Sequence, residues 1–115
     1  MNPSHEILKL VEQAQSIVIT SHKSPDGDSI GSSLALFHLF KKWNKSVRVV
    51  HPDPAPTFLH WIQGQEEIID FERNSGKAKE ALAQADLIFC LDYNEPSRVG
   101  DVMQPFLVES KAQKV

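Results

Sequence analysis

Residues 16–31 read SIVITSHKSPDGDSIG, an apolar run followed by a polar turn and then by the start of a helical pattern. The run at 16–20 is short and β-branched, which favours a strand buried on both faces. Pro25-Asp26-Gly27 is a turn sequence, because Pro fixes φ and Gly accepts conformations closed to other residues. Apolar residues between 30 and 40 then recur at helical spacing. The stretch therefore predicts a strand, a turn and a helix, which is one repeat of an α/β fold.

The same alternation continues outward in both directions. Apolar runs at 47–50 and 87–91 predict two more buried strands. Helices are predicted before, between and after them, and their ranges are 4–14, 30–43, 77–85 and 97–110. Ser4 is the expected cap of the first helix, and Pro105 must kink or restart the last. The alternation predicts a three-layer α/β fold, with a mainly parallel sheet and helices on both faces.

Three shorter segments complete the expected fold. Residues 51–56 contain three prolines and are expected to be extended loop, and 57–61 to form a helical turn. Residues 68–71 fit either a minor strand or an irregular packed segment. Residues 113–115 resemble the start of a strand. Together these predictions describe one domain over residues 1–115.

Composition limits the class of protein. The chain has 115 residues and a net charge of −3, which argues against a protein that grips long nucleic acid through basic surface alone. Its single cysteine, Cys90, excludes an internal disulfide and fits a reducing compartment. The sequence shows neither a signal peptide nor an apolar run long enough to span a bilayer, so we expect a cytoplasmic protein without a membrane partner.

Three side chains suited to metal binding follow the first predicted strand. His22, Asp26 and Asp28 fall within seven residues on a tight turn. Imidazole combined with carboxylates suits Mn²⁺, Fe²⁺ or Zn²⁺ better than Ca²⁺. In the simplest alternative, Asp26-Gly27 is only a turn and Asp28 only the N-cap of the next helix. A turn needs neither the imidazole nor the second carboxylate, so the pattern favours a site.

A further carboxylate, Asp92, directly follows the strand predicted at 87–91. Ligands of open α/β sheets bind outside the carboxyl ends of the strands. Asp92 should therefore project from the same sheet edge as His22, although a capping or surface role is the alternative for this residue alone. The two strand ends together predict one acidic site.

These residues carry a specific resemblance. Residues 22–32, HKSPDGDSIGS, resemble the first signature motif of the DHH phosphoesterases, and Asp92 with Arg98 and Gly100 resembles the second. The resemblance covers essentially the whole chain. It is closest to the branch of nanoRNases and pAp phosphatases, which degrade very short oligonucleotides and remove phosphate from adenosine bisphosphate.

The resemblance implies a ligand set. His22 and Asp26 would bind one Mn²⁺, Asp28 would bind a second, and Asp92 would bridge both. The implied function is two-metal hydrolysis of short oligonucleotides or nucleotide 3′-phosphates. Arg98 would contact a substrate phosphate, and a surface ion pair is an equal alternative for it.

Later elements of the family pattern do not occur in these 115 residues, which contain no Asp-His-His. The resemblance implies that this motif, a fourth motif and a C-terminal substrate domain complete the enzyme. We therefore expect a truncated chain that holds at most one Mn²⁺ weakly and hydrolyses little or nothing. An unpaired sheet edge near Val115 would favour self-association.

Two other functions remain open from the sequence. One is a non-catalytic α/β module that binds a nucleotide or a partner, with the acidic loop serving only as turn and cap. The other is a receiver-like domain in which Asp92 accepts phosphate with Mg²⁺, which His22 fits poorly. His5, His38, His51 and His60 have no convincing partner nearby, so each is interpreted as a solvated or core-packed histidine.

Overall fold

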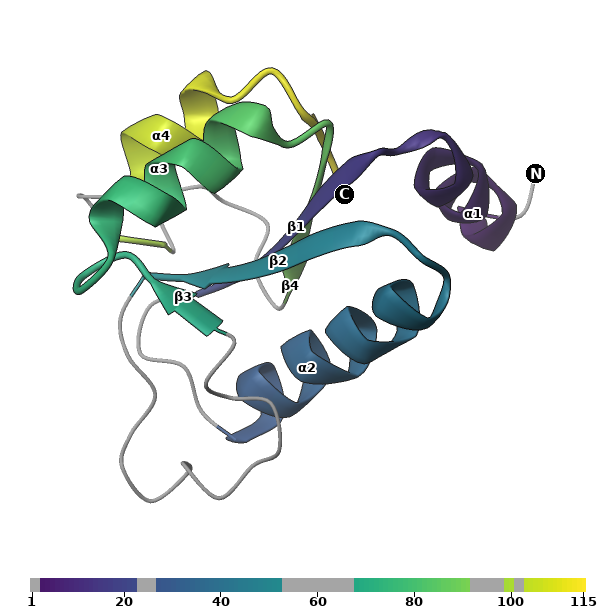
Figure 1. Cartoon of the computed structure of the whole chain (residues 1–115), viewed down its shortest axis with the longest axis horizontal. Coiled ribbons are helices and arrows are strands. Elements are labelled where there is room, and N and C mark those ends of the chain that lie inside the picture. Colours follow the sequence, from purple (N-terminus) through teal and green to yellow (C-terminus); the bar gives the residue numbers. More distant parts are fainter. Residues whose placement is uncertain (1–2, 23–26, 53–67, 92–98, 101–102) are drawn as a thin grey trace.

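The computed structural model describes residues 3–22, 27–52, 68–91, 99–100 and 103–115. Within these ranges helices and strands alternate along the chain, apart from two consecutive strands at 46–51 and 68–70 (Figure 1). The elements are α1 (Pro3–Gln13), β1 (Ser16–Ser21), α2 (Gly27–Lys42), β2 (Ser46–His51), β3 (Ile68–Asp70), α3 (Ser75–Gln84), β4 (Leu87–Leu91), α4 (Gln104–Glu109) and β5 (Gln113–Lys114). The expected helical turn at 57–61 lies outside the described residues.

The described strands form one five-stranded sheet in the order β3-β2-β1-β4-β5. Each of the four strand pairs is parallel, which confirms the predicted parallel sheet. β1 lies at the centre, where its apolar residues are covered on both faces. Residues 68–70 form β3, so the segment that the sequence left undecided is an edge strand.

Successive side chains of the central strand enter two different cores because a strand alternates its faces. Ile17 and Ile19 pack against residues of α1 and α2, whereas Val18 packs against α3 and α4. Figure 1 shows α2 on one side of the sheet and α3 with α4 on the other. The predicted three-layer arrangement, with helices on both faces, is therefore confirmed.

Two residues considered as helix N-caps, Ser4 and Asp28, lie inside their helices and not before them. α1 begins at Pro3, so Ser4 is its second residue; a proline suits the first position because no helical acceptor exists there for an N–H. α2 begins at Gly27, which makes Asp28 the second residue of the helix and not its N-cap. Asp28 still lies in the first turn, where the helix dipole favours negative charge.

The last predicted helix is much shorter than its sequence pattern suggested. Gly100 has φ 86°, a left-handed conformation that a regular helix does not contain. The helix α4 starts at Gln104 with Pro105 in its first turn, where a proline is tolerated. Residues 97–98 and 101–102 of the predicted helix lie outside the described residues. No helix in the described part of the chain is long and apolar enough to cross a membrane.

Candidate functional site

The candidate site follows from how the strands are connected. The crossover from β1 to β2 runs through α2 on one face, and the crossover from β3 to β4 runs through α3 on the other. The chain therefore leaves the central strand in one direction and returns on its opposite side, which creates a topological switch point between β1 and β4. Ligands of doubly wound sheets bind in the crevice at this point, outside the carboxyl ends of the strands.

The predicted site residues map onto this switch point as far as the structure describes them. His22 directly follows β1 and is half-buried, and Asp28 lies in the first turn of α2. Ser21, which precedes His22, pairs with Leu91, which precedes Asp92. Asp26, Asp92 and Arg98 lie outside the described residues. Among the described residues, no group of three His, Cys, Asp or Glu side chains is gathered tightly enough to hold a metal ion.

A buried polar group lies beside these residues at the end of β2. His51 is 0% exposed, and its Nε2 lies 3.0 Å from the hydroxyl of Ser33 in α2. The sequence assigned His51 to the loop after the strand, whereas it is the last residue of β2. Its core-packed interpretation is confirmed, and the hydrogen bond links the end of a central strand to the first half of α2.

Burial sets the charge of His51. Desolvation by burial, with a smaller contribution from the neighbouring charge of His22, lowers the pKa of His51 from 6.5 to about 4. The imidazole is therefore neutral at pH 7. The shift also places His22 and His51 within electrostatic reach of each other, although they come from different strands.

Two buried polar atoms at this edge have no hydrogen-bond partner within the described structure. They are the hydroxyl oxygen of Ser21 and Nδ1 of His51. On β3, Asp70 pairs with His51 in register, and its Oδ1 accepts a 2.6 Å hydrogen bond from the Arg73 amide. A row of polar residues, Ser21, His51 and Asp70, thus lies at the carboxyl ends of the neighbouring strands β1, β2 and β3.

Reasoning from sequence missed this row. The expectation that ligands bind at the carboxyl ends of strands was applied to the residues after Thr20 and Leu91. It applies equally to His51, which follows Val50. A polar residue that directly follows a β-branched run was the signal available. Ser33 carried no such signal, because it is eighteen residues from His51 in the sequence.

His22, which directly follows β1, and Asp28, in the first turn of α2, are residue types that suit a divalent transition ion. His22 is half-buried, and the ends of β1 and β2 carry the buried polar atoms of Ser21 and His51. Gly31 is exposed in α2, and a Cβ added there would meet nothing within 4 Å. Close packing against the described residues therefore does not explain this glycine.

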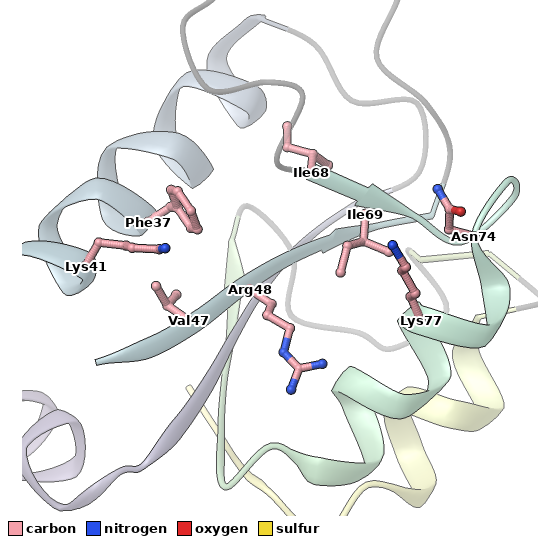
Figure 2. Close-up of a pocket in the computed structure, with 8 residues that line it drawn as sticks. All are labelled: Phe37, Lys41, Val47, Arg48, Ile68, Ile69, Asn74 and Lys77. Carbon is pink, nitrogen blue, oxygen red and sulfur yellow. The ribbon is translucent and has the colours of Figure 1, made fainter. Parts of the chain in front are cut away.

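A separate groove of about 350 Å³ runs along the outer edge of the sheet (Figure 2). Its lining residues are Phe37, Lys41, Val47, Arg48, Ile68, Ile69, Asn74 and Lys77. Figure 2 shows the groove flanked by α2 on one face of the sheet and by α3 on the other. None of the motif residues that the structure describes lines this groove, which lies at the β2–β3 side of the sheet and away from the switch point between β1 and β4.

Comparison with known proteins gives relatives over the same residues. The chain is 40% identical over 97 residues to the bifunctional oligoribonuclease and PAP phosphatase NrnA of Thermus thermophilus, covering 84% of this chain and 26% of that protein. A crystal structure of an exopolyphosphatase-related protein from Bacteroides fragilis superposes with a TM-score of 0.91 at 40% identity. The match covers 96% of this chain and 32% of that one, so the chain spans about a quarter to a third of these relatives. The N-terminal domain of the DHH family matches residues 16–113, and the chain therefore belongs to the DHH family.

Proposed function

We propose that this chain is the metal-binding half of a manganese-dependent phosphoesterase that cleaves short oligonucleotides or nucleotide 3′-phosphates. One observation carries the proposal: residues 22–32 run from the end of β1 into α2, so the motif begins at the switch point of the sheet. Family membership supports phosphoesterase chemistry. The name of the Thermus thermophilus relative supports the two substrate classes.

Each proposed ligand has a place along the chain. His22 and Asp26 would hold one Mn²⁺ and Asp28 a second, and Asp92 would supply a carboxylate to this metal site. A pair of such ions activates water and stabilises the leaving oxygen of a phosphoester. The first turn of α2 adds free backbone N–H groups and a positive dipole end, which favour carboxylate and phosphate groups there. Arg98 pairs with a substrate phosphate.

We further propose that the chain alone hydrolyses little. Its 115 residues contain no Asp-His-His, the motif expected to complete the shell of the second metal. His22 and Asp26 would hold one ion without the second, whereas two-metal hydrolysis would need the full ligand set. The half-buried Cys90 fits the reducing environment of the cytoplasm.

Calorimetric titration of the chain with Mn²⁺ tests the proposal. The wild-type chain should bind one ion weakly, and binding should disappear in His22→Ala and in Asp26→Ala. His38→Ala is the matched control, because His38 is exposed on α2 and lies outside the motif. An affinity unchanged by His22→Ala, or a wild-type chain that binds no Mn²⁺, would contradict the proposed metal site.

The second candidate is a non-catalytic α/β module that binds a nucleotide or a protein partner. The observation in its favour is that Asp28 lies in the first turn of α2, where a carboxylate stabilises the helix dipole without a metal. It predicts nucleotide binding that is equal in excess EDTA and in Mn²⁺, and that survives His22→Ala. A nucleotide affinity that rises with Mn²⁺ in the wild type, but not in His22→Ala, favours the phosphoesterase half-site.

A further inference from the structure

Two buried polar atoms lie at neighbouring strand ends without a hydrogen-bond partner within the described structure: the hydroxyl of Ser21 on β1 and Nδ1 of His51 on β2. Both residues are 0% exposed. Buried polar groups in folded proteins are almost always satisfied by protein or by ordered water. Two such atoms on adjacent strands therefore indicate a common occupant.

The strand register places these two side chains on the same side of the sheet. Ile17 pairs with Val47 and Ile19 with Val49, and these four residues enter the core beneath α2. Two residues further along each strand come Ser21 and His51, which by alternation face the same layer. Neighbouring strands are about 4.8 Å apart. A molecule that makes a hydrogen bond of about 2.8 Å to each side chain spans such a gap.

The other ring nitrogen of His51, Nε2, contacts a third element, the helix α2. Nε2 lies 3.0 Å from the Ser33 hydroxyl, and Ser33 is 0% exposed in α2. The ends of β1 and β2 and the first half of α2 thus meet around one imidazole. These elements lead directly into His22 and carry Asp28, the two proposed ligands that the structure describes.

We infer that one internal water bridges the Ser21 hydroxyl to Nδ1 of His51, and that His51 is a positioning residue for the candidate metal site. The role for metal binding rests on the proposed function, whereas the water does not. A single water needs two or more polar partners to be held inside a protein, and these two atoms supply them. The resulting series of hydrogen bonds runs from Ser21 through the water and His51 to Ser33. It fixes the end of β1, where the motif loop begins, relative to α2. Metal sites depend on such supporting hydrogen bonds for ligand orientation.

Two substitutions separate the bridge from the packing of the ring. His51→Gln keeps a polar atom near the position of Nε2, within reach of Ser33, but has none at Nδ1. His51→Asn keeps a polar atom near Nδ1 and loses the one at Nε2. Ser21→Ala removes the opposite end of the bridge. Melting temperatures and near-ultraviolet circular dichroism of each variant confirm that the comparison is made on folded protein.

The first readout needs no metal. A high-resolution crystal structure of the full chain should show one water between Ser21 and His51, and Ser21→Ala should lose it. The ¹⁵N resonance of His51 Nδ1 should shift in Ser21→Ala. Amide exchange at the start of α2, from Gly31 to Ser33, should quicken in Ser21→Ala and in His51→Gln. An empty or apolar gap together with an unmoved Nδ1 resonance would overturn the inference, whatever the protein does with Mn²⁺.

The second readout is a double-mutant cycle on Mn²⁺ affinity. Ser21→Ala and His51→Gln should each weaken Mn²⁺ binding about tenfold. This is the lower end of the range expected when a hydrogen bond that supports a metal ligand is lost. Because both remove the same bridge, the double variant should be no weaker than either single variant. An additive loss of about a hundredfold would contradict the bridge. If the wild type binds no Mn²⁺, the proposed function fails, and unchanged exchange at 31–33 in both variants then overturns the positioning role as well.

Discussion

The neutral state of His51 is a property of its position and not of its neighbours in sequence. The ring is completely buried at the end of a central strand, and burial lowers its pKa to about 4. An imidazolium there would lose its hydration and would lie near His22, so the charged form is disfavoured twice. A charge on this ring would also change its hydrogen bonding with Ser33, because both ring nitrogens would become donors.

This shift makes stability depend on pH. The pKa of His51 is lower in the folded chain than the unfolded value of 6.5, so below pH 6.5 the unfolded chain binds a proton that the folded chain does not. Stability is fully present above that pH and is lost as pH falls toward 4. Between pH 7 and pH 5 the metal-free chain should lose about 2 kcal/mol of unfolding free energy through this residue.

Urea unfolding in EDTA at pH 7 and pH 5 measures this loss. His51→Gln should remove that part of the pH dependence, whereas His38→Gln, which changes an exposed histidine, should retain it. Equal pH dependence in the wild type and in His51→Gln would mean that His51 does not carry it.

Residues of the site differ in how far the sequence could predict them. His22 and Asp28 were assigned from a local motif, and the structure places them at the end of β1 and the start of α2. The metal roles of His22, Asp26, Asp28 and Asp92 stay predictions. The link between His51 and Ser33 was not predictable in this way, because it joins two elements that only the folded sheet brings together.

At the scale of elements, burial decided which predictions succeeded. The strands predicted at 16–20, 47–50 and 87–91 are present at 16–21, 46–51 and 87–91, because central parallel strands are apolar on both faces. The helix expected at 97–110 failed because apolar periodicity continued through Gly100, whose positive φ breaks the helix. The spacing of apolar residues indicates which face of a segment is buried, but it does not indicate whether the segment forms one uninterrupted helix.

The short helix α4 offers a matched pair of neighbouring residues. Leu107 is 1% exposed and packs into the core beside α3, whereas Val108 is 54% exposed. Leu107→Ala should lower the unfolding free energy by about 2–5 kcal/mol through lost burial and a residual cavity. Val108→Ala should change it by less than about 0.5 kcal/mol. Chemical denaturation of both variants checks this, and equal losses would show that α4 does not pack as described.

At the scale of the whole molecule, the sequence predicted that the strands are parallel, but it did not predict their order in the sheet. The alternation of helix and strand fits several sheet orders. The observed order, β3-β2-β1-β4-β5, places the switch point between the strands that precede His22 and Asp92. Both ends of the candidate site thus depend on long-range packing. The same order leaves β5 at one edge of the described sheet, next to β4 alone.

The edge at β5 gives a test of the proposed self-association. The amides of Gln113 and Val115 donate inward, to the carbonyl oxygens of Asp86 and Ile88, so the amide of Lys114 between them points outward. An outward N–H beside Val115, which is 37% exposed, can pair with the edge of a second copy. We expect sedimentation to show concentration-dependent association of the wild-type chain. Lys114→Pro should abolish it, because it removes the outward N–H without removing a backbone hydrogen bond to β4. Lys114→Ala loses the same side-chain hydrogen bonds to Ser110 and Ala112 but keeps the N–H, so it should leave the association intact. A chain that sediments as a monomer at every concentration, or a Lys114→Pro variant that associates like the wild type, would exclude this edge as the interface.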